Sequence, residues 1–144
     1  MKKTFIILLG VPILLAFFAC SKSPSPRVVV MDFIEAVNQD DTASIEKYMD
    51  FNRFAQEKIK ELPEGSTQKF TPQYKEQLVN SYLGNGLTRL DWQNRWIVVN
   101  DEKIMGDSAT VEVTFMDQKT GLADYTHARL YKKNKKWIMY YIVE

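Results

Sequence analysis

Hydrophobic and polar residues alternate most regularly over Ser108–Asp117. Apolar side chains stand at every second position and β-branched residues are frequent, which is typical of a strand with one buried face. The side chains that we expect to be buried are Ala109, Val111, Val113 and Phe115. This strand lies in the middle of a region, Trp92–Glu144, that we interpret as one antiparallel sheet.

Three more segments complete a predicted four-stranded sheet. They are about Arg95–Asp101, Asp124–Lys132 and Trp137–Val143. The last of them is apolar on both faces, which is typical of a strand that is covered on both sides. The register of the first strand stays open, because residues 102–107 could hold either a bulge or a long loop.

Two turns of four residues, Gln118–Gly121 and Lys133–Lys136, fix the register of the later strand pairs. The pairs expected on the apolar face are Val111 with Ala128, Ala109 with Leu130, Leu130 with Met139, Lys132 with Trp137, and Ala128 with Tyr141. We assign this face to the core, because its side chains are consistently apolar in all three of these strands.

The opposite, outer face of the sheet mixes aromatic, aliphatic and charged side chains. Its members are Tyr125, His127, Arg129, Tyr131, Ile138, Tyr140 and Ile142. Tyr and Arg are enriched among the residues that anchor protein interfaces, so we expect one contiguous interaction surface here. The alternatives are that another segment, such as Leu62–Phe70, covers this face, or that single exposed aromatic residues lie there without a role.

Helices are predicted before the sheet. Ser25 followed by Pro26 is a helix start, and an apolar face repeats from there to Gln39. A second helix begins at Asp41 or Thr42 and continues, straight or kinked, to Leu62. A third begins after Thr71-Pro72 and ends at Gly84–Gly86. The sequence therefore predicts an α+β fold, with three N-terminal helices packed on one face of a curved, four-stranded antiparallel sheet.

The N-terminus has the pattern of an export signal. A short basic leader precedes the apolar run Phe5–Ala19, which is shorter than the ~20 residues that a membrane-spanning helix needs. Ala19-Cys20 after this run resembles the lipobox of bacterial lipoproteins, which implies cleavage before Cys20 and lipids on its thiol and amine. We assign 1–19 to a lipoprotein signal peptide, 20–25 to the lipidated Cys and a short tether, and 26–144 to a single α+β domain. The alternative is an ordinary secreted protein.

Charge and cysteine content exclude several classes of function. The chain has 19 Lys and Arg against 18 Asp and Glu, so it has no basic excess for a nucleic-acid partner. Its one cysteine is Cys20, which leaves no second thiol for a disulfide. Lys132, Lys133, Lys135 and Lys136 form a local basic turn. Such a turn is either simply solvated or in contact with anionic lipid headgroups or a phosphate-rich glycan.

Three segments carry a resemblance to a known superfamily. Ser25–Asp41 is similar to the opening helix and acidic turn of the nuclear transport factor 2-like, cystatin-like superfamily. Gly106–Val113 resembles its hairpin into a long strand, and Lys136–Val143 resembles its last strand. Within the superfamily, residues 25–144 look most like small Bacteroides-type lipoproteins that carry a domain of unknown function. The resemblance implies the helix-and-sheet cone of that superfamily and does not imply a function.

Enzymes of this superfamily use an Asp or His base with Tyr or Asp donors inside the cone. The single histidine, His127, is expected on the outer face opposite Glu112. Asp32, Asp91 and Asp101 are interpreted as surface and loop acids. The tyrosines whose hydroxyls could line a pocket are Tyr48, Tyr82 and Tyr141. No motif for a catalytic residue, a metal or a cofactor is found.

The sequence therefore predicts a non-enzymatic, lipid-anchored protein of the cell envelope, held on the outer membrane and facing the periplasm. Its expected partners are the membrane, through lipid on Cys20, and a small ligand, a second copy of the chain or another envelope protein. The ligand or partner would bind in the cone or on the outer sheet face. The alternatives are a small isomerase- or hydrolase-like enzyme and a purely structural envelope component.

Overall fold

The computed structural model describes residues 23–142 of the 144-residue chain. The predicted signal peptide, Cys20 and the last residue of the predicted final strand, Val143, lie outside the described residues. The described part forms the helices α1 (Pro26–Gln39), α2 (Thr42–Tyr48), α3 (Phe51–Lys60), α4 (Pro72–Ser81) and α5 (Leu87–Gln93). The strands are β1 (Arg95–Met105), β2 (Ser108–Asp117), β3 (Ala123–Lys133) and β4 (Lys136–Tyr141).

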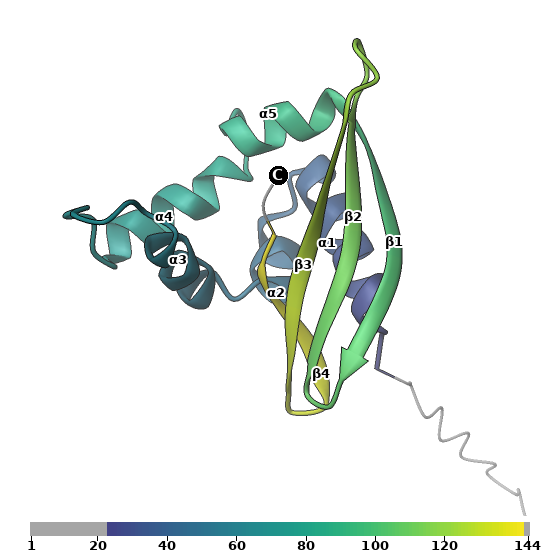
Figure 1. The fold of residues 1–144 in the computed structure, drawn as a ribbon, viewed down its shortest axis with the longest axis horizontal. Coiled ribbons are helices and arrows are strands. Elements are labelled where there is room, and N and C mark those ends of the chain that lie inside the picture. Colours follow the sequence, from purple (N-terminus) through teal and green to yellow (C-terminus); the bar gives the residue numbers. More distant parts are fainter. Residues whose placement is uncertain (1–22, 143–144) are drawn as a thin grey trace, which may run out of the picture.

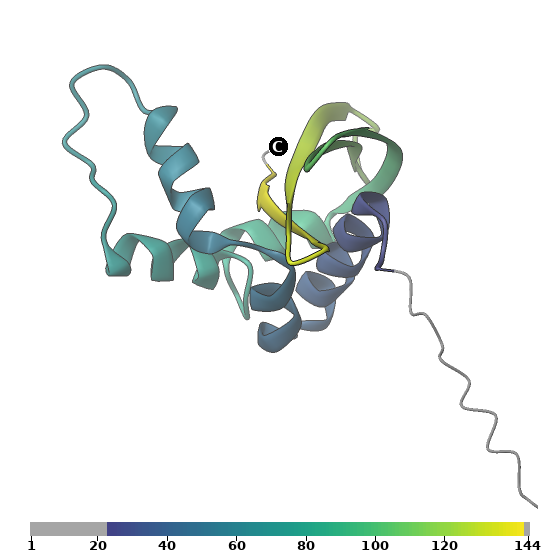
Figure 2. The ribbon, with the colours of Figure 1, turned by 90° about the horizontal axis from the view of Figure 1, so that it is seen from below.

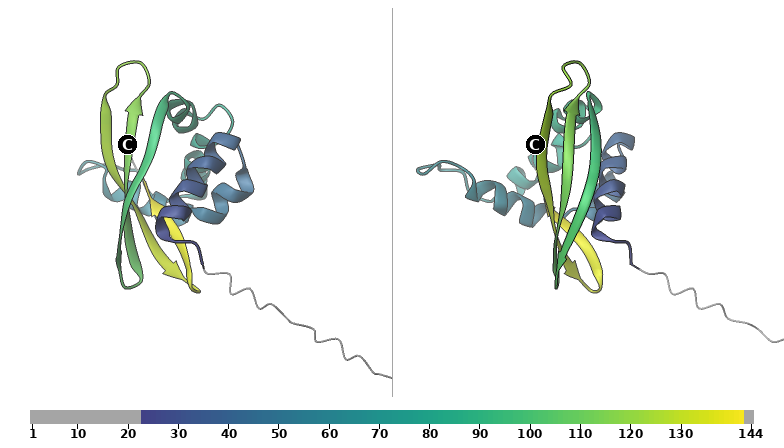
Figure 3. Two further views of the ribbon diagram at one scale, coloured as in Figure 1. Left: turned by 90° about the vertical axis from the view of Figure 1, so that its right-hand side faces the viewer. Right: turned by 45° about the vertical axis from the view of Figure 1, so that its right-hand side comes forward.

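The strands form one antiparallel sheet in the order β1-β2-β3-β4, and α1 and α5 lie on one side of it (Figures 1 and 3). The α+β prediction is thus confirmed, although residues 23–142 contain five helices instead of the three expected. Helices α3 and α4, with the exposed loop between them, project from the rest of the domain as an arm (Figure 2). Within residues 23–142, no helix has the length and apolar character needed to cross a membrane.

Strand register follows the prediction over most of the sheet. Val111 pairs with Ala128, and the apolar residues predicted for the core face of β2 are all buried. The pairing of Ala128 with Tyr141 was wrong, because β4 carries a bulge and Arg129 pairs with Tyr141 instead. The extra residue shifts the alternation of side chains beyond it. Ile142 therefore turns into the core, where it is 1% exposed, and does not belong to the outer face.

The first strand is also bulged, but just before residues 102–107 and not within them: Glu102–Met105 continue β1, and a tight turn at Gly106 and Asp107 leads into β2, so no long loop is present. Val99 pairs with Val113 and Glu102 with Val111, so Asn100 and Asp101 together stand opposite the single residue Glu112, and β1 has one additional residue. Arg27 at the start of α1 supports this bulge. Its guanidinium donates to the carbonyl oxygens of Val99 and Asn100, at 3.1 and 2.9 Å, and its backbone N–H donates to the Glu102 carboxylate.

The predicted second helix is two helices. Asp50 starts α3, because its carboxylate accepts a hydrogen bond from the Arg53 N–H. Before it, Met49 forms a bridge with Met139 of β4, and the Asp50 N–H donates to the Met139 carbonyl at 2.7 Å. The extended backbone at Met49 interrupts the helix and lies along the free edge of β4. The prediction of one helix, straight or kinked, was therefore wrong.

The end of helix α5 was predicted from the sequence to belong to the sheet. Trp92, which was taken as the beginning of the sheet, lies in α5 and is 2% exposed. The chain reaches α5 through a tight turn at Gly86, where an added Cβ would collide with the backbone of Asn80 and Ser81. Trp92 then packs between α1 and the sheet, with ring centroids 6.1 Å from Phe33 and 5.4 Å from Phe115.

Candidate functional site

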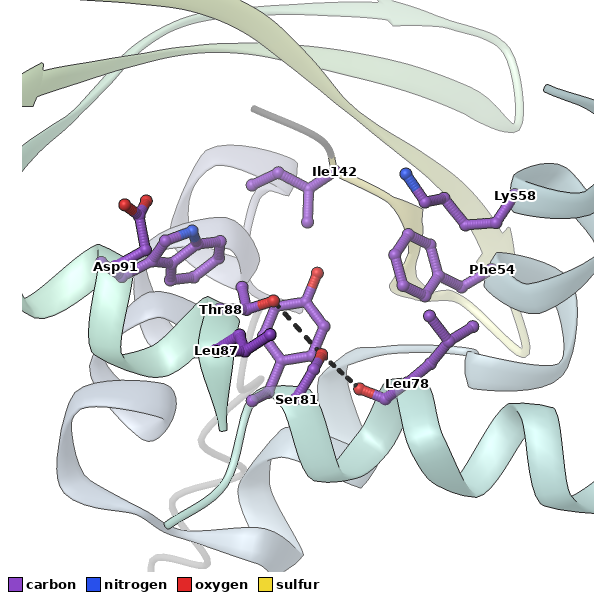
Figure 4. A pocket seen from close by; sticks show the side chains of 10 residues that line it. Phe54, Lys58, Leu78, Ser81, Leu87, Thr88, Asp91 and Ile142 are labelled. Carbon is purple, nitrogen blue, oxygen red and sulfur yellow. Dashed lines mark hydrogen bonds between the residues drawn. The ribbon is translucent and has the colours of Figure 1, made fainter. Parts of the chain in front are cut away.

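A pocket of about 340 Å³ lies between α3, α4, α5 and the end of the chain after β4. We call it the cone pocket (Figure 4). Its lining residues are Phe54, Lys58, Leu78, Ser81, Tyr82, Leu87, Thr88, Asp91, Trp92 and Ile142. These positions are far apart in the sequence, and only the fold brings them together.

The position of α5 determines the shape of the pocket, and Arg89 holds this helix in place. The Arg89 guanidinium donates to the carbonyl oxygens of Val37 and Asn38 at the end of α1, at 2.8 and 3.0 Å. It also donates to the Gly84 carbonyl at 2.8 Å. A cation at this end of α1 is favoured by the helix dipole. Helix α5 is thereby fixed to both α1 and the turn that follows α4.

Two hydroxyl groups on the pocket wall form a short chain of hydrogen bonds. Thr88 Oγ1 lies 3.2 Å from Ser81 Oγ, and Ser81 Oγ donates to the Leu78 carbonyl at 2.7 Å (Figure 4). The Ser81 proton is thus directed at a backbone oxygen. In this arrangement the two hydroxyls can accept or share a hydrogen bond with a bound molecule. The partners in these two hydrogen bonds are a hydroxyl and a backbone carbonyl, and neither partner is a side-chain base.

Charged side chains stand on opposite sides of the pocket. Figure 4 places Lys58 of α3 on one side and Asp91 of α5 on the other. The Asp91 carboxylate lies 2.7 Å from the Arg95 guanidinium, and the Lys58 amine lies 3.7 Å from Glu61. Between them the wall is formed by Phe54, Trp92 and other apolar side chains. A molecule with an apolar body and opposite charges at its two ends would therefore share Lys58 with Glu61 and Asp91 with Arg95.

The three predicted pocket tyrosines do not lie together. Tyr82 lines the cone pocket. Tyr141 lies behind its wall, with a ring centroid 6.3 Å from that of Phe54. Tyr48 lies in a separate hollow beside the turn between β3 and β4. Sequence reasoning missed Lys58 and treated Asp91 as a surface acid, because no local spacing connects them with Tyr82.

The outer face of the sheet is divided by the start of α3. Arg53 lies over the rings of Tyr140 and Tyr131, at 3.7 and 4.8 Å, and the Tyr131 hydroxyl donates to Asp50 at 2.7 Å. Burial, followed by this hydrogen bond, raises the pKa of Tyr131. These contacts leave Tyr131 and Tyr140 only partly exposed, and Ile138 is partly exposed as well.

The other half of this face is open. Tyr125, His127 and Arg129 are exposed, and His127 pairs with Glu112 as expected. The predicted single contiguous surface is therefore wrong, because α3 covers one half and Ile142 is buried. Trp96, which the prediction did not include, is exposed on β1 at the same side of the sheet as Tyr125.

Among the described residues, no group of three or more His, Cys, Asp and Glu side chains could hold a metal ion.

Tyr141 gives the fold a measurable pH dependence. Burial of the ring, and then its hydrogen bond to the Glu61 carboxylate, raise the pKa of Tyr141 from 10.0 to about 12. Between pH 10.0 and about 12, the Tyr141 hydroxyl keeps its proton in the folded state and loses it in the unfolded state. The free energy of unfolding therefore falls as the pH rises through this range. We expect Tyr141→Phe to make this fall shallower in thermal melts. The control is Tyr125→Phe at an exposed ring, and equal slopes for the two variants would contradict the prediction.

Comparison with known proteins supports the architecture. No protein-family model matches the sequence, and no curated protein matches it. Among solved structures, the chain is similar to one from Campylobacter jejuni that is provisionally named an NTF2-like transpeptidase. The TM-score is 0.50 and the identity 17%, over 83% of this chain and 100% of the other. At this identity the likeness concerns the fold alone, and the described chain has an NTF2-like α+β fold.

Proposed function

We propose that this protein is a non-enzymatic, lipid-anchored component of the bacterial cell envelope that binds a small ligand in the cone pocket. The observation that carries the binding role is the pocket itself, with its apolar wall and the opposed charges of Lys58 and Asp91. Its volume, about 340 Å³, is at the lower end of the range for small-molecule sites. The anchor is supported by Ala19-Cys20 directly after an apolar run.

The chemistry of the lining defines the class of ligand. A carboxylate would lie toward Lys58, a positively charged group toward Asp91, and an apolar body against Phe54 and Leu78. The Ser81 and Thr88 hydroxyls would add hydrogen bonds that fix the orientation of the ligand. A small zwitterion with an apolar side chain, such as an amino acid or a short peptide, has these features. Tethered at Cys20, the domain would meet such molecules in the periplasm.

A second candidate function is a small enzyme. Asp91 and Tyr82 line the same pocket, and this pair is the kind of base and donor that an isomerase-like site needs. The solved structure of similar fold is provisionally named a transpeptidase. Two observations favour binding over catalysis. Asp91 is already paired with Arg95, and His127 lies on the outer face of the sheet, away from the pocket.

Ligand binding can be tested on the full-length protein extracted from its native membrane. Native mass spectrometry should detect a bound small molecule, and Leu78→Trp should fill the pocket and displace it. We expect the affinity to fall at least about tenfold, equivalent to ~1.4 kcal/mol. The matched control is Leu122→Trp, at an exposed leucine in the turn between β2 and β3 that does not line the pocket.

Two outcomes would contradict this proposal. One is a protein that carries no bound molecule and gains no thermal stability from any amino acid or short peptide. The other is a bound molecule that survives Leu78→Trp as well as it survives Leu122→Trp. Turnover of a bound peptide that is abolished by Asp91→Asn, with binding retained, would instead favour the enzyme.

A further inference from the structure

Two hairpin turns and the start of the described chain meet at one end of the sheet (Figures 1 and 3). Ser23 and Pro24 line a hollow of about 530 Å³ together with residues of the β3–β4 turn, among them Lys133 and Lys136. The β1–β2 turn lies beside the β3–β4 turn, because the Lys132 N–H donates to the Asp107 carbonyl at 2.8 Å. We call this part of the molecule the tether end.

The tether end is basic. Its exposed lysines are Lys47, Lys132, Lys133, Lys135 and Lys136. Acids beside them are Asp107 in the β1–β2 turn, Glu46 on α2 and Asp50 before α3, and the lysines outnumber these acids. Asn134 and Lys135 have positive φ angles of 50° and 64°, as the two central residues of a tight hairpin turn do. The lysines are therefore presented on a compact tip and not on a long loop.

Exposed apolar side chains accompany these charges. Ile104 and Met105 stand at the end of β1, directly before the turn, and are 51% and 54% exposed. Lysines beside exposed aliphatic side chains are the combination found on surfaces that rest on anionic bilayers. The lysines contact the phosphates of the headgroups, and the apolar side chains reach toward the boundary with the acyl chains.

The length of the tether determines which surface this end meets. Cys20 precedes Ser23 by three residues, and three residues of extended chain span at most about 11 Å. A lipid on Cys20 therefore keeps the tether end close to the bilayer, at a distance comparable to the Debye length of ~8 Å in physiological salt. This step rests on the lipid anchor in the proposed function.

We propose that the tether end docks on the anionic phospholipid headgroups of the bilayer that holds the anchor. Docking orients the domain as well as keeping it at the membrane. Helix α5 lies at the opposite end of the sheet from the β3–β4 turn (Figure 1). The α5 side of the cone pocket is then directed away from the bilayer, where a soluble ligand can enter it.

The experiment uses the full-length lipidated protein in vesicles of phosphatidylcholine, alone or mixed with phosphatidylglycerol. A nitroxide is attached at Met105→Cys, with Leu122→Cys at the opposite end of the sheet as the matched control. Collision with a water-soluble nickel chelate, measured by electron paramagnetic resonance, reports how accessible each label is. We expect the label at 105 to be protected only in the anionic vesicles and the label at 122 to stay accessible in both. Adding Lys133→Glu and Lys136→Glu should abolish the protection at 105.

Each other outcome overturns the proposal. Equal accessibility of the label at 105 in both kinds of vesicle would mean that the protein does not recognise the headgroup charge. Protection at 105 that survives the two Lys→Glu substitutions would mean that these lysines do not hold the tether end on the bilayer. Equal protection at 105 and 122 means that the domain has no preferred orientation. Failure of the anchor is recognised separately, because the protein would then lack the mass of the lipid on Cys20 and would not float with vesicles of either composition.

Discussion

Replacing Trp92 by alanine is expected to lower the free energy of unfolding by about 3–5 kcal/mol. The indole is 2% exposed, and its ring centroid lies 5.4 Å from that of Phe115 and 5.5 Å from that of Tyr82. Deleting it removes the ring contact that joins α5 to Phe115 of the sheet and leaves a cavity that the neighbouring rings cannot fill. A domain of this size has a total stability of ~5–15 kcal/mol, so the loss is a large part of it. Urea unfolding followed by circular dichroism measures the change.

The matched control is the same substitution at Trp96, which is 57% exposed on β1. There we expect a change below about 1 kcal/mol, because little apolar surface is removed from the core. A comparable loss for the two variants would mean that α5 does not contribute to the core in the way described.

Replacing Cys20 by serine is expected to move the protein from the membrane fraction to the soluble fraction of the envelope. Each CH₂ group that is buried in the bilayer contributes ~0.8 kcal/mol, so two or three acyl chains hold a protein almost permanently. Serine provides no thiol for the first acyl chains. The measurement is fractionation after a wash in high salt, which removes proteins that are held by charge alone.

Ser21→Ala serves as the control, because it leaves the thiol in place and should keep the protein in the membrane fraction. A Cys20→Ser variant that stays with the membrane after the wash would disprove the lipid anchor. A variant released only by the wash would mean that charge alone, as at the tether end, retains it weakly.

Strand pairing could be predicted from the sequence because it depends on local features. The length of the turn before β3 and the alternation along β2 together require Val111 to face Ala128, as observed. The bulge in β4 has no such local signal. It brings Ile142 into the core, where several elements meet, and this packing outweighs the alternation of the strand.

The helical part was less predictable where its helices depend on the sheet. The sequence around Met49 reads as the interior of a helix, and only the edge of β4 offers the backbone partner that interrupts it. Helix α5 has seven residues and lacks a side-chain cap, so little in its sequence marks its start. Helices with clear caps, such as α1 after Ser25 and α4 after Thr71, begin where they were predicted.

The candidate site was predictable only in part, for a similar reason. Tyr82 was recognised because an aromatic residue at helical spacing suggests burial next to a cavity. Lys58 and Asp91 belong to two helices that are separated by the exposed loop and by α4, and no short motif includes both. Charged residues on amphipathic helices usually face water, so their position beside a pocket becomes visible only in three dimensions.

The bridge between Met49 and Met139 has a consequence for crowding on a membrane. Lipid-anchored proteins are confined to two dimensions, where exposed strand edges of neighbouring copies meet often and can join into continuous sheets. At the β4 edge, the chain before α3 already occupies this pairing position, with the Asp50 N–H on the Met139 carbonyl. At the β1 edge, Arg27 occupies the carbonyls of the bulge. At one point of each margin a segment of the same chain thus occupies the pairing position, which hinders the addition of a continuous strand and favours separate molecules at high surface density.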